Sequence, residues 1–192
     1  MKISITETGV TLDFEATTNR RCGNCTLCCK LLPTRWKKAN TRCEHQRHTG
    51  CAIYAQRPVE CQLFSCRWLS APDEMAGMRR PDRSHYVIDP MFDEVRLVPN
   101  DGGEPTILEV LQIWMDPAHP EAERDPALRA YMLRMAEKYG VASLLRWASD
   151  DATAVFPPPL STDGEWHEQR SRATARDIGL WSKLAPENRP LE

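Results

Sequence analysis

The stretch "CGNCTLCC", Cys22 to Cys29, places four cysteines within eight residues, and the last two are adjacent. All eight cysteines of the 192-residue chain fall in the region that begins with this stretch: Cys22, Cys25, Cys28, Cys29, Cys43, Cys51, Cys61 and Cys66. The apolar residues of the same region follow no sustained helical or strand period. We therefore expect the cysteines, rather than a hydrophobic core, to organise the fold of residues 20–70.

Several features favour reduced thiols over disulfides. Residues 1–18 lack the apolar core of a secretory signal, and no apolar stretch approaches the roughly 20 residues that span a bilayer. The sequence thus predicts a cytoplasmic protein with no membrane segment, and thiols stay reduced in that compartment. A chain of this length also buries enough surface to fold without disulfides. Clustered thiols in such a setting are typical of metal ligands.

The spacing of the first cysteines bears on the identity of the metal. Zinc usually draws two ligands from each of two separate knuckles. Cys22, Cys25 and Cys28 instead have the x2 spacing with which a short loop wraps a 4Fe-4S cluster in bacterial ferredoxins, although those proteins continue with x3-C-P where this chain has Cys29. We therefore favour an iron–sulfur cluster slightly over zinc or iron ions.

The adjacent pair Cys28 and Cys29 limits how the ligands can be shared. Neighbouring side chains diverge in most backbone conformations, so we expect the two thiols to face different sites, unless one of them is not a ligand. Eight cysteines then allow two four-cysteine sites, or one site with cysteines left over. The spacing does not choose between these arrangements.

The histidines are secondary candidates. His45 and His48 lie among the later cysteines, and either could replace a cysteine at zinc or at one iron of a two-iron cluster. His85, His119 and His167 lie far from the cysteines in the sequence and are given no role.

Charge is divided unevenly along the chain. Between Arg20 and Arg67, ten lysines and arginines stand against only Glu44 and Glu60, a net charge of +8 that leaves −10 for the rest. A basic segment can indicate nucleic acid. Eight thiolates, however, would bring up to −8 to this segment, and nearby cations lower thiol pKa values. We favour charge balance at a metal site and do not expect nucleic acid as the partner.

The whole chain predicts an α+β fold, in which a small cysteine-rich metal-binding region joins an α/β layer of short strands and one clear helix. The helix covers residues 125–140, with Asp125 as its N-cap and Gly140 as its C-terminal cap. A one-turn helix is expected near residues 52–58, and a polar connection at 71–83. The expected strands are a hairpin within 2–14, a pair at 85–89 and 94–99 around a turn at Asp89-Pro90, and single strands at 106–115, 141–147 and 152–156.

These elements suggest three parts. Residues 1–70 would form the N-terminal strands and the metal-binding region, residues 71–156 the α/β layer, and residues 157–192 a polar C-terminal tail. Regular structure is expected to stop at Pro157 to Pro159, with at most one helix beyond, anchored by Trp166 or Trp181.

The cysteine region resembles the YkgJ-type cysteine-cluster proteins, a family described as a zinc- or iron-chelating domain. The resemblance rests on "CGNCTLCC" and on "CAIYAQRPVECQLFSC", residues 51–66, and covers about a quarter of the chain. It implies metal or iron–sulfur binding by the cysteines, with a framework of Tyr54, Arg57, Pro58 and Phe64. Arg57 lies between Cys51 and Cys61, where its guanidinium could hydrogen-bond to cluster sulfurs or to carbonyls of the ligand residues.

Three functions are compatible with these features. The first is a metal-binding protein that acts as a chelator, a carrier or a metal-dependent accessory protein, for which a protein partner is possible. The second is a cluster-dependent enzyme, because a related domain occurs in flagellin lysine N-methylases; no Gly-rich loop of the S-adenosylmethionine-binding Rossmann kind is visible here. The third is a nucleic-acid-binding module, which the basic segment alone suggests.

Overall fold

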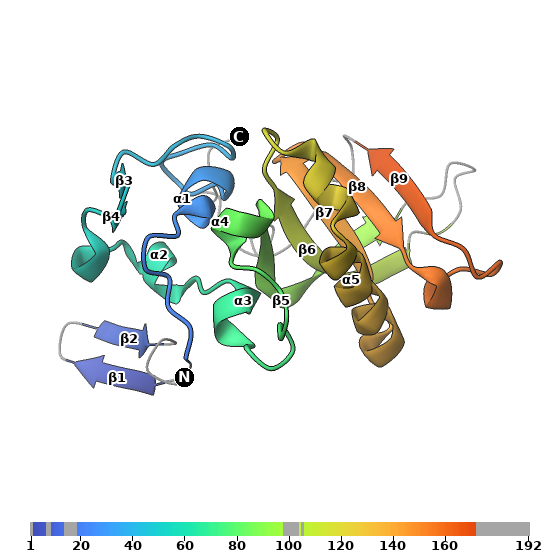
Figure 1. Ribbon diagram of the computed structural model, residues 1–192, viewed down its shortest axis with the longest axis horizontal. Coiled ribbons are helices and arrows are strands. Elements are labelled where there is room, and N and C mark those ends of the chain that lie inside the picture. The colour runs from blue at the N-terminus through green and yellow to red at the C-terminus, as the bar shows by residue number, and fades with distance from the viewer. Residues whose placement is uncertain (1, 7–8, 14–18, 98–103, 105, 172–192) are drawn as a thin grey trace.

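The computed structural model describes residues 2–6, 9–13, 19–97, 104 and 106–171, and these form the predicted α+β fold (Figure 1). Short elements make up its first part: β1 Lys2–Thr6, β2 Gly9–Asp13, α1 Leu27–Leu31, β3 Gln46–Arg47, β4 Gly50–Cys51, η2 Tyr54–Gln56, α2 Val59–Leu63, α3 Arg67–Ser70 and α4 Pro81–Ser84. The second part contains the larger sheet: β5 Tyr86–Leu97, β6 Thr106–Met115, η3 Pro120–Arg124, α5 Pro126–Tyr139, β7 Ala142–Ala148, β8 Asp151–Phe156, η4 Pro158–Leu160 and β9 His167–Ser171.

The five-stranded sheet has the order β5-β6-β7-β8-β9. β6 and β7 are parallel and are joined by α5, whereas the other neighbours are antiparallel. This arrangement confirms the predicted strands at 106–115, 141–147 and 152–156 and the helix between them. The N-terminal hairpin of β1 and β2 and the helical turn η2 are also confirmed.

Two predictions for this part were wrong. The expected strand pair around Asp89-Pro90 is one continuous strand, β5, which pairs along its length with β6. The pairing shifts register between Ile88 and Phe92, so the proline that suggested a turn instead lies in an irregular stretch, where its missing N–H costs no ladder bond. Regular structure also continues past Pro159, because β9 pairs with β8 at the edge of the sheet. Residues 172–192, with Trp181, lie outside the described residues.

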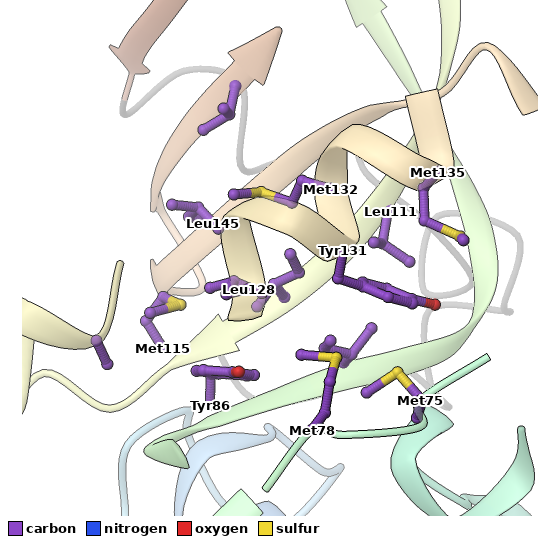
Figure 2. Packing of buried hydrophobic residues seen from close by; sticks show 14 of the residues in the cluster. Met75, Met78, Tyr86, Leu111, Met115, Leu128, Tyr131, Met132, Met135 and Leu145 are labelled. Carbon is purple, nitrogen blue, oxygen red and sulfur yellow. The ribbon is translucent and has the colours of Figure 1, made fainter. Parts of the chain in front are cut away.

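The helix α5 covers one face of the sheet, as its sequence predicts. The Asp125 carboxylate accepts a hydrogen bond from the Ala127 N–H at 3.0 Å, and Gly140 ends the helix with a left-handed φ of 68°. The core beneath it includes Tyr131, Met132, Leu111 and Leu145 (Figure 2). The connection 71–83, expected to be polar, adds the buried Met75 and Met78 to this core.

The cysteine-rich region packs on the opposite face of the same sheet. Side chains alternate along a strand, so Tyr86 and Met115 face α5 whereas Val87 and Trp114 face away from it. Leu27 of α1 joins Val87 and Trp114 in a separate apolar cluster. Within the described ranges, no helix has the length and apolar character needed to cross a membrane.

Candidate metal centre

A tight turn leading into α1 places the first four cysteines. The Cys25 N–H donates to the Cys22 carbonyl at 2.9 Å, and Gly23 adopts a φ of 53°, a conformation that favours glycine. Cys28 and Cys29 follow in α1 itself. The stretch expected to be one loop around one centre is therefore a loop followed by a helix.

The helix α1 is anchored to the sheet by its leucines. Leu31 is fully buried and Leu27 nearly so, and both pack against Val87 of β5 and Trp114 of β6. Partly buried side chains surround this cluster, and three cysteines are among them: Cys25, Cys28 and Cys66. These thiols thus lie where the cysteine-rich region meets the sheet, in surroundings that disfavour unpaired charge.

Four cysteines influence one another's ionisation and are called here the first group: Cys22, Cys25, Cys28 and Cys66. Burial raises the pKa of the Cys66 thiol to about 12, and the nearby charges of Cys22 and Cys25 act in the same direction. A hydrogen bond with Cys29 and burial raise the pKa of Cys28 well above its usual value, and Cys66 and Cys22 add to this rise. Cys25, Cys28 and Cys66 pack against the same apolar cluster, and the charge of Cys22 acts on Cys28 and Cys66, so the four thiols belong to one region.

Two arginines accompany the first group. Arg80 donates to the Cys22 carbonyl at 3.4 Å and to Asn24 Oδ1 at 2.7 Å, and its charge opposes the burial that raises the pKa of Cys25. Arg20 donates to two backbone carbonyls, and its guanidinium interacts electrostatically with Cys66. The thiols of this group therefore have cations beside them, as the charge of the sequence suggested, although Arg80 lies outside the basic segment 20–67.

Three further cysteines form a second group: Cys29, Cys43 and Cys61. The hydrogen bond from Cys28 and the charges of Lys37 and Arg57 lower the pKa of Cys29 to about 7. Burial raises the pKa of Cys61 to about 11, and the charges of Cys29 and Cys43 contribute to that rise. The Cys43 N–H also donates to the Cys29 carbonyl at 3.2 Å, which fixes these two residues side by side.

The second group has its own cations, Lys37 and Arg57. Lys37 is only 7% exposed, and its ammonium interacts with all three thiols of the group. Arg57 stacks over Tyr54 at 3.8 Å from the ring centroid, and its charge reaches both Cys29 and Cys61. Its Nε is buried without a hydrogen-bond partner among the described residues. A buried donor beside thiols fits the expected role of hydrogen-bonding to sulfur.

The structure shows how the side chains of the adjacent pair lie. The Cys28 and Cys29 thiols do not diverge completely, because Cys28 donates a hydrogen bond to Cys29. Their other partners nevertheless differ: Cys28 lies with the first group, and Cys29 lies with the second. The pair is the point at which the two groups touch.

The remaining candidates are less closely placed. Cys51 lies in β4, opposite Gln46 of β3. Its neighbour Gly50 lies close to the backbone carbonyl of Gly23. His45 lies 3.5 Å from Glu44 and His48 is exposed. In the described part of the chain, neither histidine belongs to a set of three potential ligands with donor atoms within 4.8 Å of one another.

The thiols stand further apart than the ligands of one zinc ion. Sulfurs at 2.3 Å from a tetrahedral zinc are about 3.8 Å from one another. Among the described residues, which include all eight cysteines, no three sulfurs lie within 4.8 Å of one another. The eight cysteines form no disulfide and are all partly exposed. They are thus gathered into groups without being closed around a single-ion position.

The structure also brings together three residues that the sequence gave no role. Donor atoms of His85, Asp116 and His119 lie within 4.8 Å of one another. The spacing of Asp116 and His119 is a weak signal in the sequence, and His85 joins them only through the pairing of β5 with β6.

No family model, curated protein or solved structure matches the chain. The assignment of the two groups therefore rests on the residues themselves.

Proposed function

We propose that the protein binds metal through its eight cysteines, as an iron–sulfur cluster or as zinc or iron ions, and acts in the cytoplasm as a chelator, a carrier or a metal-dependent accessory protein. One observation carries the proposal: seven cysteines separate into two groups, each with its own buried or half-buried cations. A cation beside a thiol favours the thiolate, which is the form that binds metal. Cys51 is the remaining cysteine. We assign it to the second group because the first group already has four cysteines.

Two features support a cluster over a single zinc ion in the first group. Cys22, Cys25 and Cys28 keep the x2 spacing of cluster-binding loops, with Cys66 as the fourth ligand. The Ser65 hydroxyl, next to Cys66, is buried without a hydrogen-bond partner in the described part of the chain and could donate to a cluster sulfur.

The resemblance to YkgJ-type proteins supports the same proposal. Two of its framework residues lie near candidate ligands: Arg57 lies beside the second group, and Phe64 packs with Cys66 against the apolar cluster that includes Leu27 and Leu31. Pro58 precedes α2, which carries Cys61. Arg57 thus lies beside candidate ligands, and Phe64 shares an apolar cluster with Cys66.

Part of the basic segment is engaged within the protein, which reduces the charge available to nucleic acid. Lys30 pairs with Asp116 at 2.7 Å, and Arg67 pairs with Glu74 at 2.9 Å. Lys37 is buried against the second group. Phosphate binding needs exposed cations, and these side chains are already engaged.

A protein partner has a possible contact surface beside the second group. Val59 and Leu63 lie one turn apart on α2 and are 66% and 49% exposed, and Cys61 lies between them in the sequence. Exposed apolar side chains next to a metal ligand suit a carrier that passes its metal to another protein.

Anaerobic purification followed by absorption spectroscopy and analysis of iron, zinc and acid-labile sulfide tests the proposal. We expect bound iron and sulfide, a visible absorption band of the cluster, and loss of that band in Cys25→Ser and Cys66→Ser. In Cys43→Ser and Cys61→Ser we expect the band to persist and any second metal to be lost. Ser149→Ala, in the turn between β7 and β8 and outside both cysteine groups, is the control and should keep the band.

The outcomes separate the alternatives. If the protein is colourless and contains stoichiometric zinc, the bound metal is zinc and not a cluster, and the proposal of metal binding stands. Folded protein with substoichiometric zinc and iron would contradict the proposal as a whole.

A further inference from the structure

Three potential metal ligands meet at the end of the sheet where β5 begins and β6 ends. His85 precedes β5 and Asp116 follows β6, and the strands pair at Tyr86 and Met115. The Asp116 N–H donates to the His85 carbonyl at 2.9 Å, and the His119 N–H donates to the Asp116 carbonyl at 2.9 Å. Backbone hydrogen bonds thus fix all three residues relative to one another, and their donor atoms lie within 4.8 Å.

One ring nitrogen of His119 is held by a carboxylate. Its Nδ1 lies 3.1 Å from Glu121 Oε1. Histidines that bind metal commonly donate their other ring N–H to a carboxylate, which fixes the tautomer and the ring orientation. Engagement of Nδ1 by Glu121 leaves Nε2 for an ion. The His85 ring is stacked on the His119 ring at 3.6 Å between centroids, so the two imidazoles lie face to face.

Asp116 provides a fixed negative charge at the same point. It is only 4% exposed, and its carboxylate accepts from Lys30 Nζ at 2.7 Å and from the Ala118 N–H at 3.0 Å. Ligand carboxylates are usually hydrogen-bonded themselves. Lys30 contacts both oxygens, so it can keep one of them while the other binds an ion.

We propose that His85, Asp116 and His119 bind one divalent first-row transition-metal ion at a site separate from the cysteines. Two imidazoles and one carboxylate are the donor set of non-haem Fe(II) sites with open positions, and imidazole also suits zinc. Two ligands of one ion, each about 2.1 Å from it, lie at most about 4.2 Å apart, so the donor atoms must move closer together and the stacked imidazole rings must turn until their nitrogens converge on the ion. His85 and Glu121 also line a pocket of about 390 Å³.

Cobalt binding to the full-length protein tests this proposal, because cobalt on thiolates gives charge-transfer absorption that cobalt on nitrogen and oxygen ligands does not. We expect wild-type protein to bind one Co²⁺ without sulfur charge transfer, in addition to any cobalt on the cysteines. His119→Gln and His85→Asn should remove this ion and leave the sulfur bands unchanged. Asparagine is chosen at position 85 because His85 has a left-handed φ of 65°, which asparagine tolerates. Glu121→Gln should weaken binding by roughly 10–100-fold.

The control is His167→Gln, which removes a surface histidine paired with Asp163 at 2.8 Å but not part of a three-ligand set in the described residues. It should bind cobalt as wild type does. The proposal is overturned if wild-type protein binds cobalt only with sulfur charge transfer, or if the folded His119→Gln and His85→Asn proteins keep the nitrogen- and oxygen-ligated ion. Either result leaves the cysteine proposal standing, because the sulfur bands report on it separately.

Discussion

Among the cysteines whose pKa is shifted by their surroundings, Cys29 has the lowest pKa. It accepts a hydrogen bond from Cys28 and lies near Lys37 and Arg57, and its pKa is about 7. In metal-free protein at neutral pH, we expect iodoacetamide to modify Cys29 before Cys66 and Cys61, whose pKa values are about 12 and 11. Mass spectrometry of peptides after brief labelling measures the order.

The cations supply the control for this labelling experiment. Arg57→Gln should slow modification of Cys29 because it removes one of the charges that lower its pKa. Faster labelling of Cys66 than of Cys29 in the wild-type protein would contradict the assignment of Cys29 as the thiolate of the pair.

Asp89 is a second residue with an unusual ionisation. Burial and the charge of Asp93 raise its pKa to about 7, although the Trp114 side chain hydrogen-bonds to it and Arg146 lies nearby. Because its usual pKa is about 3.9, the folded state holds this proton more tightly than the unfolded state between about pH 4 and 7. The contribution of Asp89 to stability is therefore present below this range and is lost as pH rises, by up to about 1.4 kcal/mol per pH unit.

Asp89→Asn should flatten this part of the pH dependence. The free energy of unfolding, measured with urea between pH 4 and 7, is expected to fall less steeply with pH in the variant than in wild type. The exposed Asp150, changed to Asn, serves as the control and should leave the slope unchanged. Equal slopes for wild type and Asp89→Asn would show that the Asp89 proton does not differ between the folded and unfolded states.

Among the elements, α5 depends on its cap. The Asp125 carboxylate accepts hydrogen bonds from the Ala127 N–H and, through its other oxygen, from the Tyr86 hydroxyl and from Arg79. Asp125→Ala should lower the free energy of unfolding by about 1–2 kcal/mol, since loss of an N-cap typically costs about 1 kcal/mol and the buried Tyr86 hydroxyl loses its acceptor.

Urea unfolding of this variant measures the loss. Asp163→Ala, which breaks the exposed pair with His167, is the comparison and should cost much less. If Asp125→Ala costs no more free energy of unfolding than Asp163→Ala, the cap does not stabilise α5.

The elements also show what the sequence could and could not predict. The helix α5 was predictable because Asp125, Pro126 and Gly140 mark its ends and its apolar positions repeat with helical spacing. β9 was not, because "HEQRS" is a polar edge strand with few strand-forming residues, and its pairing with β8 depends on a distant partner.

The same contrast holds for the candidate sites. The cysteine spacing indicated the metal-binding region, but the division into two groups needed the fold, because Cys66 joins the first group from α3's N-terminal end and Cys61 joins the second from α2. The set of His85, Asp116 and His119 depends on strand pairing over about 30 residues, for which the sequence carries no local signal.

At the scale of the whole molecule, the two faces of the sheet should respond differently to metal removal. The face under α5 has a core of its own, whereas the described residues 20–66 contribute only Leu27 and Leu31 to the buried hydrophobic side chains. After chelation we expect hydrogen exchange to accelerate across residues 40–63 while β6, β7 and α5 stay protected, with α1 intermediate. Mass spectrometry of exchanging peptides measures this pattern. Simultaneous loss of protection in the sheet would show that the two faces fold as one unit.

The helix α1 has a consequence for how this chain can change in evolution. In five residues it directs Cys28 to one group, Cys29 to the other, Lys30 to Asp116 and Leu31 into the apolar cluster. Each residue added to a helix rotates the later side chains by about 100° around its axis. Insertions or deletions within α1 would therefore disturb four different contacts at once, whereas the turn between β3 and β4 contains the exposed His48 and can accept them. Length variation among descendants of this sequence should accordingly fall in that turn and spare α1.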